Sequence, residues 1–404
     1  MADLKPIQPM EAIRAFEARK PELRGAYSYL DFWQDEHASM FTVAKSAGFD
    51  ILNDISEAFE RALKEGKTPQ WFARNLQPTL MAKGWWGKKM VEDPDTGEMV
   101  PAQLGSARRL ERIFDTNMRV SYAAGHWAAF EQNKRGRPFL RYVTMRDDHV
   151  RPQHARRHNL ILPVDHPYWN EWAPPCGWGC RCTLQSLSQR DIDRLVAEGE
   201  NLFFEPPENT RRNFTNRRTG EVTRVPDGID PGWAYNPGRA GYEARVGQAF
   251  AEKIADAQPP FVAAAVEERV NSSAFERFFV DPRGSMPVAA IAETFAPAIG
   301  ADVRAAIIEA DAMVRQRQRF PDLTVQDYRS LLSIGTDPTL ILQDPERSFI
   351  LQQLADGRWR YVALQVNPKT HIAFVTSFHY VREETVQRIL KNEAVRILLD
   401  RRNR

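Results

Sequence analysis

The sequence predicts a multidomain α+β protein. Its 404 residues exceed the size of one ordinary domain. In the first half of the chain apolar residues repeat at helical spacing, as at Ile51, Ile55, Phe59 and Leu63. Residues 339–381 instead contain short apolar runs separated by turn residues, which indicates strands. A run of helices followed by a run of strands in one chain is typical of the α+β class.

Composition limits the classes of function. Hydrophobic residues make up 43% of the chain, enough for real cores, and 27% charged residues favour a soluble surface. The net charge of +2 gives no overall signature of polyanion binding. The first residues lack the pattern of a signal peptide, and no apolar run is long enough to span a bilayer. We therefore expect no membrane partner, and synthesis and first action in a cytoplasm.

The chain is predicted to divide into four parts. Residues 1–40 combine prolines and aromatic residues and suit either an arm that binds a neighbour or a partly ordered terminus. Residues 41–200 contain helices and a compact segment rich in Cys, His and Pro. Residues 201–284 are expected to form an extended hairpin and loop segment with a helical connector. Residues 285–404 are expected to form a separate domain of helices and a four-stranded antiparallel sheet.

Start and stop signals define the elements of the first three parts. Thr68-Pro69 supplies the N-cap and first residue of a helix that ends near Gly84, and Ser106 caps a long helix that ends near Gly136. A shorter helix is predicted at 188–199, and turn residues predict hairpin tips at 93–98 and 219–220.

In the last part four strands are predicted at 339–343, 348–354, 359–366 and 371–381. The connections between them begin with Asp344-Pro, Asp356-Gly and Asn367-Pro, which suit antiparallel neighbours. Helical patterns fill 288–320, and a final helix from Glu383 is expected to extend through Ile397 and Leu398 across the sheet.

One short segment gathers all three cysteines and four of the eight histidines. His154 and His158 are four residues apart and would share one face of a helix. Prolines and glycines in the same segment let the chain turn so that Cys176, Cys180 and Cys182 can converge. These five side chains are candidate ligands of a structural zinc ion, although the C-x3-C-x-C spacing is tighter than in common zinc fingers.

Other interpretations of the thiols stay open. A free cysteine is a small buried hydrophobe, and we place this structural role ahead of zinc. A disulfide comes third, because a chain without a secretion signal points to a reducing compartment. No Ser or Cys of this segment has a general-base partner by spacing, which argues against a catalytic thiol.

Two ordered motifs carry a family resemblance. The first signature stretch, residues 147–182, contains Asp147-Asp148-x-Val150-Arg151-Pro152-x-His154 and, further on, Pro174-Pro175-x4-Cys180-Arg181-Cys182. It resembles the head-morphogenesis domain of Mu-type phage F proteins. The second signature stretch, residues 216–238, is threaded with Gly and Pro and resembles the segment that follows in those proteins. Cys176 is extra to the Cys-Arg-Cys pair of the family, so a zinc site that uses it would not be a family property.

The resemblance covers roughly residues 50–250 and implies a minor capsid protein present in few copies near the portal. Its implied partners are the portal and major capsid proteins, with scaffold and genome DNA as further candidates. Its implied location is the host cytoplasm during assembly and then the inside of the virion head. F-type proteins also resemble carriers of toxin cargo, but no Arg…Ser-Thr-Ser…Glu-x-Glu order of an ADP-ribosylating enzyme is found in the last domain.

The last domain is similar in element order to small ribonuclease toxins related to barnase, EndoU, colicin and RelE. Metal-free RNA cleavage needs a base, an acid and cations around the phosphate. The expected catalytic residues are His379, Ser377 and Arg360, and the expected substrate contacts are Lys369, His371 and Arg358. Two of these histidines are eight residues apart, about 26 Å along a strand at roughly 3.3 Å per residue, and cannot serve one centre. A metal-independent ribonuclease carried with the virion is therefore the alternative function of the chain. The last domain can also be a binding domain in which these residues only form part of the surface.

Overall fold

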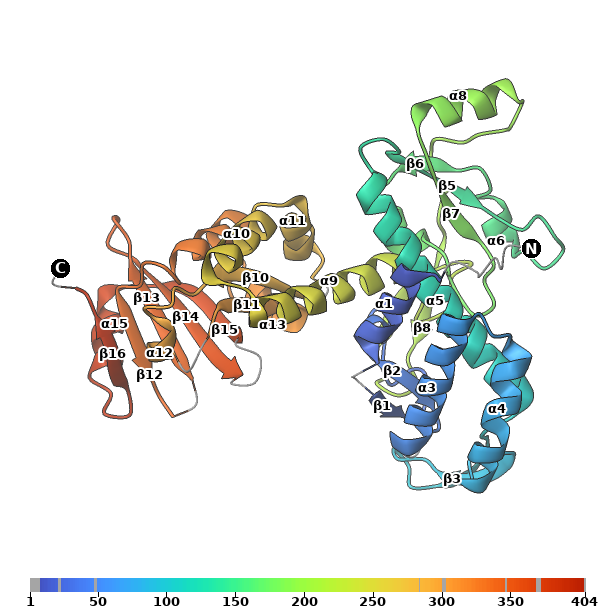
Figure 1. The fold of residues 1–404 in the computed structure, drawn as a ribbon, viewed down its shortest axis with the longest axis horizontal. Helices are drawn as coiled ribbons and strands as arrows, with labels where there is room; N and C mark the ends of the chain where they lie inside the picture. The colour runs from blue at the N-terminus through green and yellow to red at the C-terminus, as the bar shows by residue number, and fades with distance from the viewer. Residues whose placement is uncertain are drawn as a thin grey trace, which may run out of the picture. The chain divides into compact units, whose positions relative to one another are not determined.

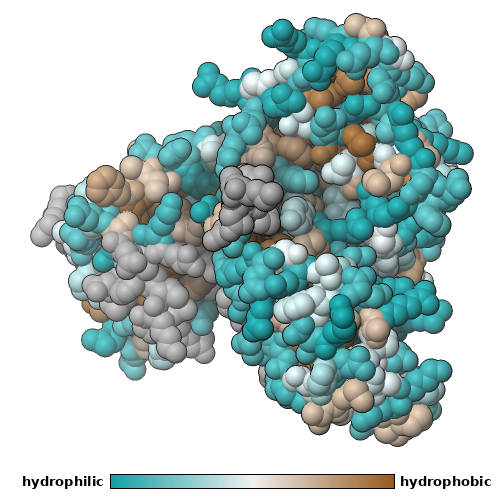
Figure 2. Space-filling view, turned by 45° about the vertical axis from the view of Figure 1, so that its right-hand side comes forward, coloured by the Kyte–Doolittle hydropathy of each residue, from teal (hydrophilic) through white to brown (hydrophobic). Residues whose placement is uncertain are grey.

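The computed structural model describes residues 8–20, 23–46, 49–282, 284–299, 303–345, 347–367 and 372–402. The chain forms two compact units, of which the first ends at Arg245 and the second begins at Val246 (Figure 1). On the face shown in Figure 2 the surface is mainly hydrophilic, with scattered hydrophobic patches. Within the described ranges, no helix combines the length and the apolar character required for a membrane crossing.

Four helices build the core of the first unit (Figure 1). They are α1 (Met10–Arg19), α3 (Phe49–Glu65), α4 (Pro69–Ala82) and α5 (Ala107–Asn133). Phe16 packs on Phe59 with ring centroids 4.7 Å apart, and Phe72 packs on Phe114 at 5.5 Å. Because Phe16 belongs to α1, part of the predicted N-terminal arm lies in this core. The predicted caps form, since the hydroxyls of Thr68 and Ser106 each accept a backbone N–H of the first turn at 3.2 Å.

Short elements surround these helices. The strands β1 (Leu23–Ala26) and β2 (Phe41–Ala44) pair in parallel, with α2 (Glu36–Ser39) between them in the chain. The strands β3 (Lys88–Glu92) and β4 (Met99–Gln103) form an antiparallel hairpin. Its tip is the turn-rich segment predicted at 93–98.

A three-stranded sheet follows α5. Its central strand is β5 (Phe139–Val143), flanked by β6 (Ile161–Pro163) and β7 (Thr183–Leu187). The short helices α6 (Pro152–Ala155) and α7 (Trp169–Trp172) lie in the connections, and α8 (Gln189–Ala197) begins after Ser188. Buried Trp127 of α5 and Trp169 of α7 pack in the core of this sheet. The first signature stretch therefore wraps around a small sheet that rests on the long helix.

The second signature stretch begins in a hairpin of β8 (Arg211–Thr215) and β9 (Val222–Pro226), with the predicted tip at 219–220. Beyond β9 the chain packs Ile229 and Trp233 against Trp172 and Cys176 of the first stretch. Helix α9 (Pro237–Asp256) follows. The two stretches thus share one hydrophobic cluster in the first unit.

The second unit contains a seven-stranded sheet in the order β10-β11-β15-β14-β13-β12-β16. All neighbours are antiparallel except β11 and β15. The strands are β10 (Ser285–Ala290), β11 (Ala305–Glu309), β12 (Leu340–Gln343), β13 (Ser348–Gln353), β14 (Trp359–Asn367), β15 (Ile372–Val381) and β16 (Arg396–Asp400). The helices are α10 (Pro259–Val270), α11 (Ser273–Val280), α12 (Ala296–Ile299), α13 (Ala310–Arg319), α14 (Val325–Arg329), the 3-10 helix η1 (Ser330–Ser333) and α15 (Glu383–Leu390).

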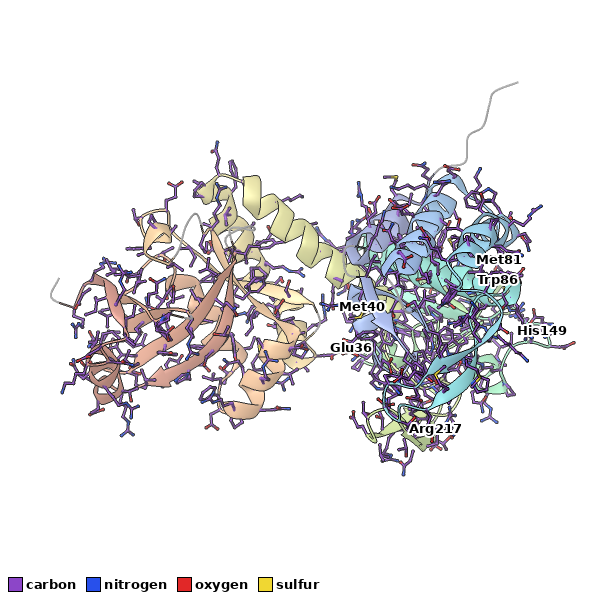
Figure 3. The ribbon with its side chains drawn as sticks, turned by 90° about the horizontal axis from the view of Figure 1, so that it is seen from below. Glu36, Met40, Met81, Trp86, His149 and Arg217 are labelled. Carbon is purple, nitrogen blue, oxygen red and sulfur yellow. The ribbon has the colours of Figure 1, made fainter. Side chains whose placement is uncertain are left out.

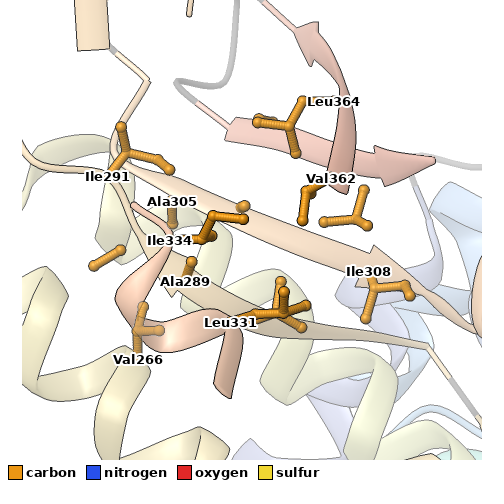
Figure 4. Packing of buried hydrophobic residues seen from close by; sticks show 14 of the residues in the cluster. Val266, Ala289, Ile291, Ala305, Ile308, Leu331, Ile334, Val362 and Leu364 are labelled. Atoms are coloured by element: carbon orange, nitrogen blue, oxygen red, sulfur yellow. The ribbon is translucent and has the colours of Figure 1, made fainter. Parts of the chain in front are cut away.

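Alternating side chains place a core on each face of this sheet. On one face Val362 and Leu364 of β14 pack with Val266 of α10 and Leu331 of η1 (Figure 4). On the other face Trp359 and Ala363 of the same strand pack with Val386 of α15. A sheet covered on both faces has apolar residues at nearly every position of its inner strands.

The predictions for this unit were right only in part. The patterns at 288–320 predict helices, and α12 and α13 do form there, but β11 also lies in this range and β10 overlaps its start. These two strands enlarge the sheet beyond the four predicted strands, which do form in the predicted order. Both strands are buried at nearly every position, so hydrophobic periodicity does not distinguish them from buried helix. The final helix ends at Leu390, and Ile397 instead pairs with Leu342 as part of β16. That pairing joins distant segments, which local patterns do not reveal.

Candidate functional site

The two signature stretches are joined by polar contacts around Asp230. Its carboxylate accepts a hydrogen bond from the guanidinium of Arg151 at 2.9 Å and another from the backbone N–H of Trp178 at 2.8 Å. The N–H of Asp230 donates to the carbonyl of Cys176 at 3.1 Å. The same guanidinium nitrogen of Arg151 donates to the carbonyl of Trp178 at 3.0 Å. One side chain of the second stretch therefore holds both halves of the first stretch.

Two glycines allow this close approach. A Cβ added to Gly177 would lie 2.3 Å from the carboxylate of Asp230 and 2.6 Å from the guanidinium of Arg151. Gly228 has a φ of +99°, and a Cβ there would lie 2.6 Å from Cβ of Gln153. Side chains at these positions would push the stretches apart.

His154 connects the stretches to the thiols. Its Nε2 lies 2.8 Å from the carbonyl oxygen of Gly228. A carbonyl can only accept, so Nε2 carries the proton and Nδ1 has a free lone pair. That Nδ1 lies 3.5 Å from Sγ of Cys182 and 3.7 Å from Sγ of Cys180. The three ligand atoms are within 4.8 Å of one another.

The third thiol, Cys176, is fully buried beside this group and interacts with Cys180. Burial raises the pKa of Cys176 well above its ordinary value. The pKa of Cys180 is lowered, first by the hydrogen bond with Cys176 and then by the one with Cys182. All three thiols are free, without a disulfide between them.

His158 lies apart from the thiols. Its Nδ1 is 3.1 Å from the backbone N–H of Thr144, and its Nε2 is 2.8 Å from Nε of Arg146. Both ring nitrogens therefore face donors of the protein. Helix α6 ends at Ala155, so the four-residue helical spacing from His154 is not maintained. The structure brings three of the five predicted zinc ligands together, places Cys176 beside them, and leaves His158 out.

The remaining motif residues have varied surroundings. Asp147 accepts a hydrogen bond from Arg181 at 2.5 Å, which lowers the pKa of that carboxyl. Asp148 is exposed. Pro175 is buried and lines a cavity of about 160 Å³ together with Cys180 and Cys182. His149 projects from the loop after β5 at the edge of the unit (Figure 3).

Arg157 is a buried residue whose role the sequence does not reveal. This side chain is 3% exposed, and its guanidinium carbon lies 3.2 Å from the centre of the Trp172 ring. It donates to the hydroxyl of Tyr168 at 2.5 Å. The dipeptide Arg156-Arg157 has the appearance of a solvated basic pair, so the sequence carried no signal for this burial. Asp230 was part of a motif, but its partner was not visible in the sequence.

A second, larger cavity of about 320 Å³ lies in the first unit. We call it the arginine groove, and it is lined by Arg19, Tyr29, His37, Met40, Thr42, Val43, Ala44, Arg109, Arg112, Ile113, Thr116, Asn117, Val120, Trp178, Gly232, Trp233 and Tyr235. Trp178 and Trp233 meet edge to face at 5.1 Å, so both signature stretches contribute to the wall. Among the described lining residues there is no carboxylate. The groove is therefore aromatic and cationic.

In the second unit, His379 and Ser377 lie on one face of β15. The hydroxyl of Ser377 is 3.4 Å from Nδ1 of His379. The imidazole is stacked on Phe320 at 4.7 Å and contacts Tyr361 at 4.8 Å. Burial, and then the charge of Arg319, lowers the pKa of His379. The ring is therefore neutral at pH 7.

The predicted cations do not join this pair. His379 is opposite Tyr361 in the register, so Arg360, one position along β14, points to the other face. The Arg360 guanidinium binds Gln352 at 2.7 Å and Ser333 at 3.0 Å. Arg358 pairs with Asp356 and lies over the ring of Tyr380 on that same other face. Lys369 and His371 lie outside the described residues.

Part of the first unit matches a known protein family. Residues 53–185 match the family described as Phage Mu protein F like protein. This range contains the whole first signature stretch. The chain therefore carries a Mu F-like domain, which confirms the resemblance inferred from its motifs.

Two individual relatives support this family match. The chain is 33% identical over 282 residues to the putative capsid assembly protein F of Escherichia phage Mu, which covers 66% of this chain and 62% of that protein. It is 30% identical over 226 residues to the Mu-like prophage FluMu F protein of Haemophilus influenzae, covering 54% of this chain and 53% of that protein. The chain thus spans less than two thirds of the length of either relative. No solved structure matches it.

Proposed function

We propose that this chain is a minor capsid protein that acts in phage head morphogenesis. The observation that carries the proposal is its 33% identity to a phage Mu protein named for capsid assembly. Folding of both signature stretches into one module supports it, because the resemblance rests on those stretches. The proposed partners are the portal and major capsid proteins, with scaffold and genome DNA as further contacts. The proposed location is the host cytoplasm during assembly and the inside of the head afterwards.

The arginine groove is our proposed contact surface. Trp, Tyr and Arg are the residues that most often dominate binding energy at protein interfaces. The groove offers all three types, and Arg112 and Trp178 on its wall are exposed. Because its described charged lining is cationic throughout, the occupant that fits is an acidic segment with apolar side chains from another capsid component.

The test is to quantify this chain by mass spectrometry in heads purified from the phage or prophage that encodes it. A low copy number per head is expected. Arg112→Glu should reduce incorporation into heads, because it places a carboxylate in the groove. Arg108→Glu makes the same charge reversal at an exposed position of α5 that does not line the groove, and should incorporate normally. Heads that lack the chain overturn the capsid proposal, and equal incorporation of both variants overturns the groove.

RNA cleavage by the second unit is a second proposal, in which the first unit is the carrier. Its support is the Ser377–His379 contact, together with a neutral imidazole that can act as a base and the nearby positive charge of Arg319. The full chain should degrade RNA in the presence of a chelator. His379→Gln should lower the rate about 100-fold or more, whereas His149→Gln, at an exposed position of the first unit, should not. Intact RNA with the wild-type chain overturns this proposal.

A further inference from the structure

The buried group of three thiols and one imidazole has the composition of a zinc centre. We propose that His154, Cys176, Cys180 and Cys182 bind one structural zinc ion through Nδ1 and three Sγ atoms. Neither the family match nor the named relatives describe a metal. The inference does not depend on the proposed function, since it rests on the geometry of these side chains alone.

The distances fit tetrahedral coordination. Zinc lies about 2.1 Å from a histidine nitrogen and about 2.3 Å from a thiolate sulfur. At the tetrahedral angle these two bonds place nitrogen and sulfur about 3.6 Å apart. The observed separations from Nδ1 of His154 are 3.5 Å to Cys182 and 3.7 Å to Cys180. A zinc ion therefore fits between these atoms with little movement.

The surroundings of the imidazole are those of a metal ligand. Metal-bound histidines commonly donate their other ring N–H to a carbonyl or carboxylate, which fixes the tautomer. Here Nε2 of His154 donates to the carbonyl of Gly228 and leaves Nδ1 facing the sulfurs. The hydroxyl of Tyr142 is buried, with no nitrogen or oxygen partner among the described residues. It lies beside the thiols, where a metal-bound thiolate would be a stronger acceptor than a thiol.

The fourth ligand is Cys176, whose thiol interacts with Cys180 and lies beside, not within, the group of three atoms that are within 4.8 Å of one another. Three thiolates and one zinc ion carry a net charge of −1, which costs free energy when buried unless cations are close. Arg151 and Arg181 both interact electrostatically with this thiol group. Half-buried Cys182 lines the cavity of about 160 Å³, which gives an ion a route to the site.

A zinc ion would reinforce the hydrogen bonds that already join the two signature stretches. His154 belongs to α6, and the thiols precede β7. His154 is hydrogen-bonded to Gly228, and Cys176 to Asp230, both of the second signature stretch. The ion would therefore hold both signature stretches in one arrangement, as structural zinc does in small domains.

The test begins with the full chain, purified without an affinity tag under reducing conditions. Elemental analysis should find one zinc per chain. Exchange of the zinc for Co²⁺ should give the intense d–d absorption of tetrahedral coordination and the charge-transfer band of thiolate bound to cobalt. Folded protein that contains no zinc and gives no such spectrum with added Co²⁺ overturns the proposal, and leaves the thiols as buried hydrophobes.

Variants test the ligand set. Cys180→Ser and His154→Ala should each lose the zinc, whereas His158→Ala should retain one ion per chain, because that imidazole lies apart from the thiols. Cys176→Ser should reduce the charge-transfer intensity of the cobalt form by about a third, since that intensity scales with the number of thiolates. Loss of zinc in His158→Ala, or an unchanged cobalt spectrum in Cys176→Ser, overturns this assignment of ligands. The Co²⁺ spectrum of the wild-type chain involves no substitution, so it tests the zinc site even if a variant fails to fold.

Discussion

Arg151 and Asp230 form an ion pair at 2.9 Å although 79 residues separate them in the chain. The pair joins a residue of the Mu F-like match to one beyond its end at residue 185. The backbone of Trp178 completes the contact from a third segment. We therefore expect the integrity of the first unit to depend on a residue outside residues 53–185, the range that matches the family.

Asp230→Ala should destabilise the first unit by about 1–3 kcal/mol, because it leaves a guanidinium and a backbone N–H without their acceptor. Both side chains of the pair are about a third exposed, which places the effect toward the low end of that range. Denaturant unfolding of the full chain measures it through the transition of the first unit. Asp148→Ala, at an exposed position of the same module, should change stability by less than about 0.5 kcal/mol. Equal effects of the two substitutions would contradict the role of Asp230.

Gly228→Ala should be more destabilising than Gly220→Ala. Both glycines have positive φ, so both substitutions incur backbone strain of about 1–2 kcal/mol. Only at Gly228 would the new methyl group meet neighbours, namely Gln153 and Trp172, whereas nothing lies within 4 Å at Gly220. The difference between the two unfolding free energies isolates the cost of separating the stretches. No difference between the two variants would mean that the stretches tolerate separation.

Removal of zinc should lower the thermal midpoint of the first unit and leave that of the second unit unchanged. A ligand that binds only the folded state stabilises it by about 2.7 kcal/mol at a hundredfold excess over its Kd. Scanning calorimetry with chelator, and then with zinc restored, measures the effect. His158→Ala should respond to chelator as the wild-type chain does. A first unit insensitive to chelator would argue that the ion contributes nothing to stability.

The second unit should lose stability as the pH falls below the ordinary histidine pKa of 6.5. Burial, assisted by Arg319, lowers the pKa of His379 in the folded state. The unfolded chain therefore binds the proton first, so the contribution of His379 is complete above 6.5 and is lost at lower pH. The difference between the thermal midpoints measured above and below that pH should be smaller in His379→Gln than in the wild-type chain. In His149→Gln the difference should equal that of the wild-type chain. A wild-type midpoint that does not depend on pH would contradict the prediction.

Much of the local structure was predictable from the sequence. Thr68, Ser106 and the turn at 219–220 act through contacts a few residues away, so their patterns indicate the structure directly. The strands β10 and β11 were missed because complete burial removes the alternation that marks a strand.

The candidate sites were predictable only in part. The clustering of Cys176, Cys180 and Cys182 in the chain also brings them together in space. His158 and Arg360 were misplaced because their directions depend on where α6 ends and on the register of β14 against β15. Neither is encoded locally, since register follows from pairing across the whole sheet.

The hydrogen bond from His154 to the carbonyl of Gly228 also bears on synthesis. The ribosome makes the thiols dozens of residues before it makes the glycine that orients their imidazole. A nascent chain that has just passed Cys182 therefore still lacks the backbone that fixes the ring, and completion of this module must wait until the second stretch has emerged. Expression fragments cut near residue 200 should accordingly remain incompletely folded.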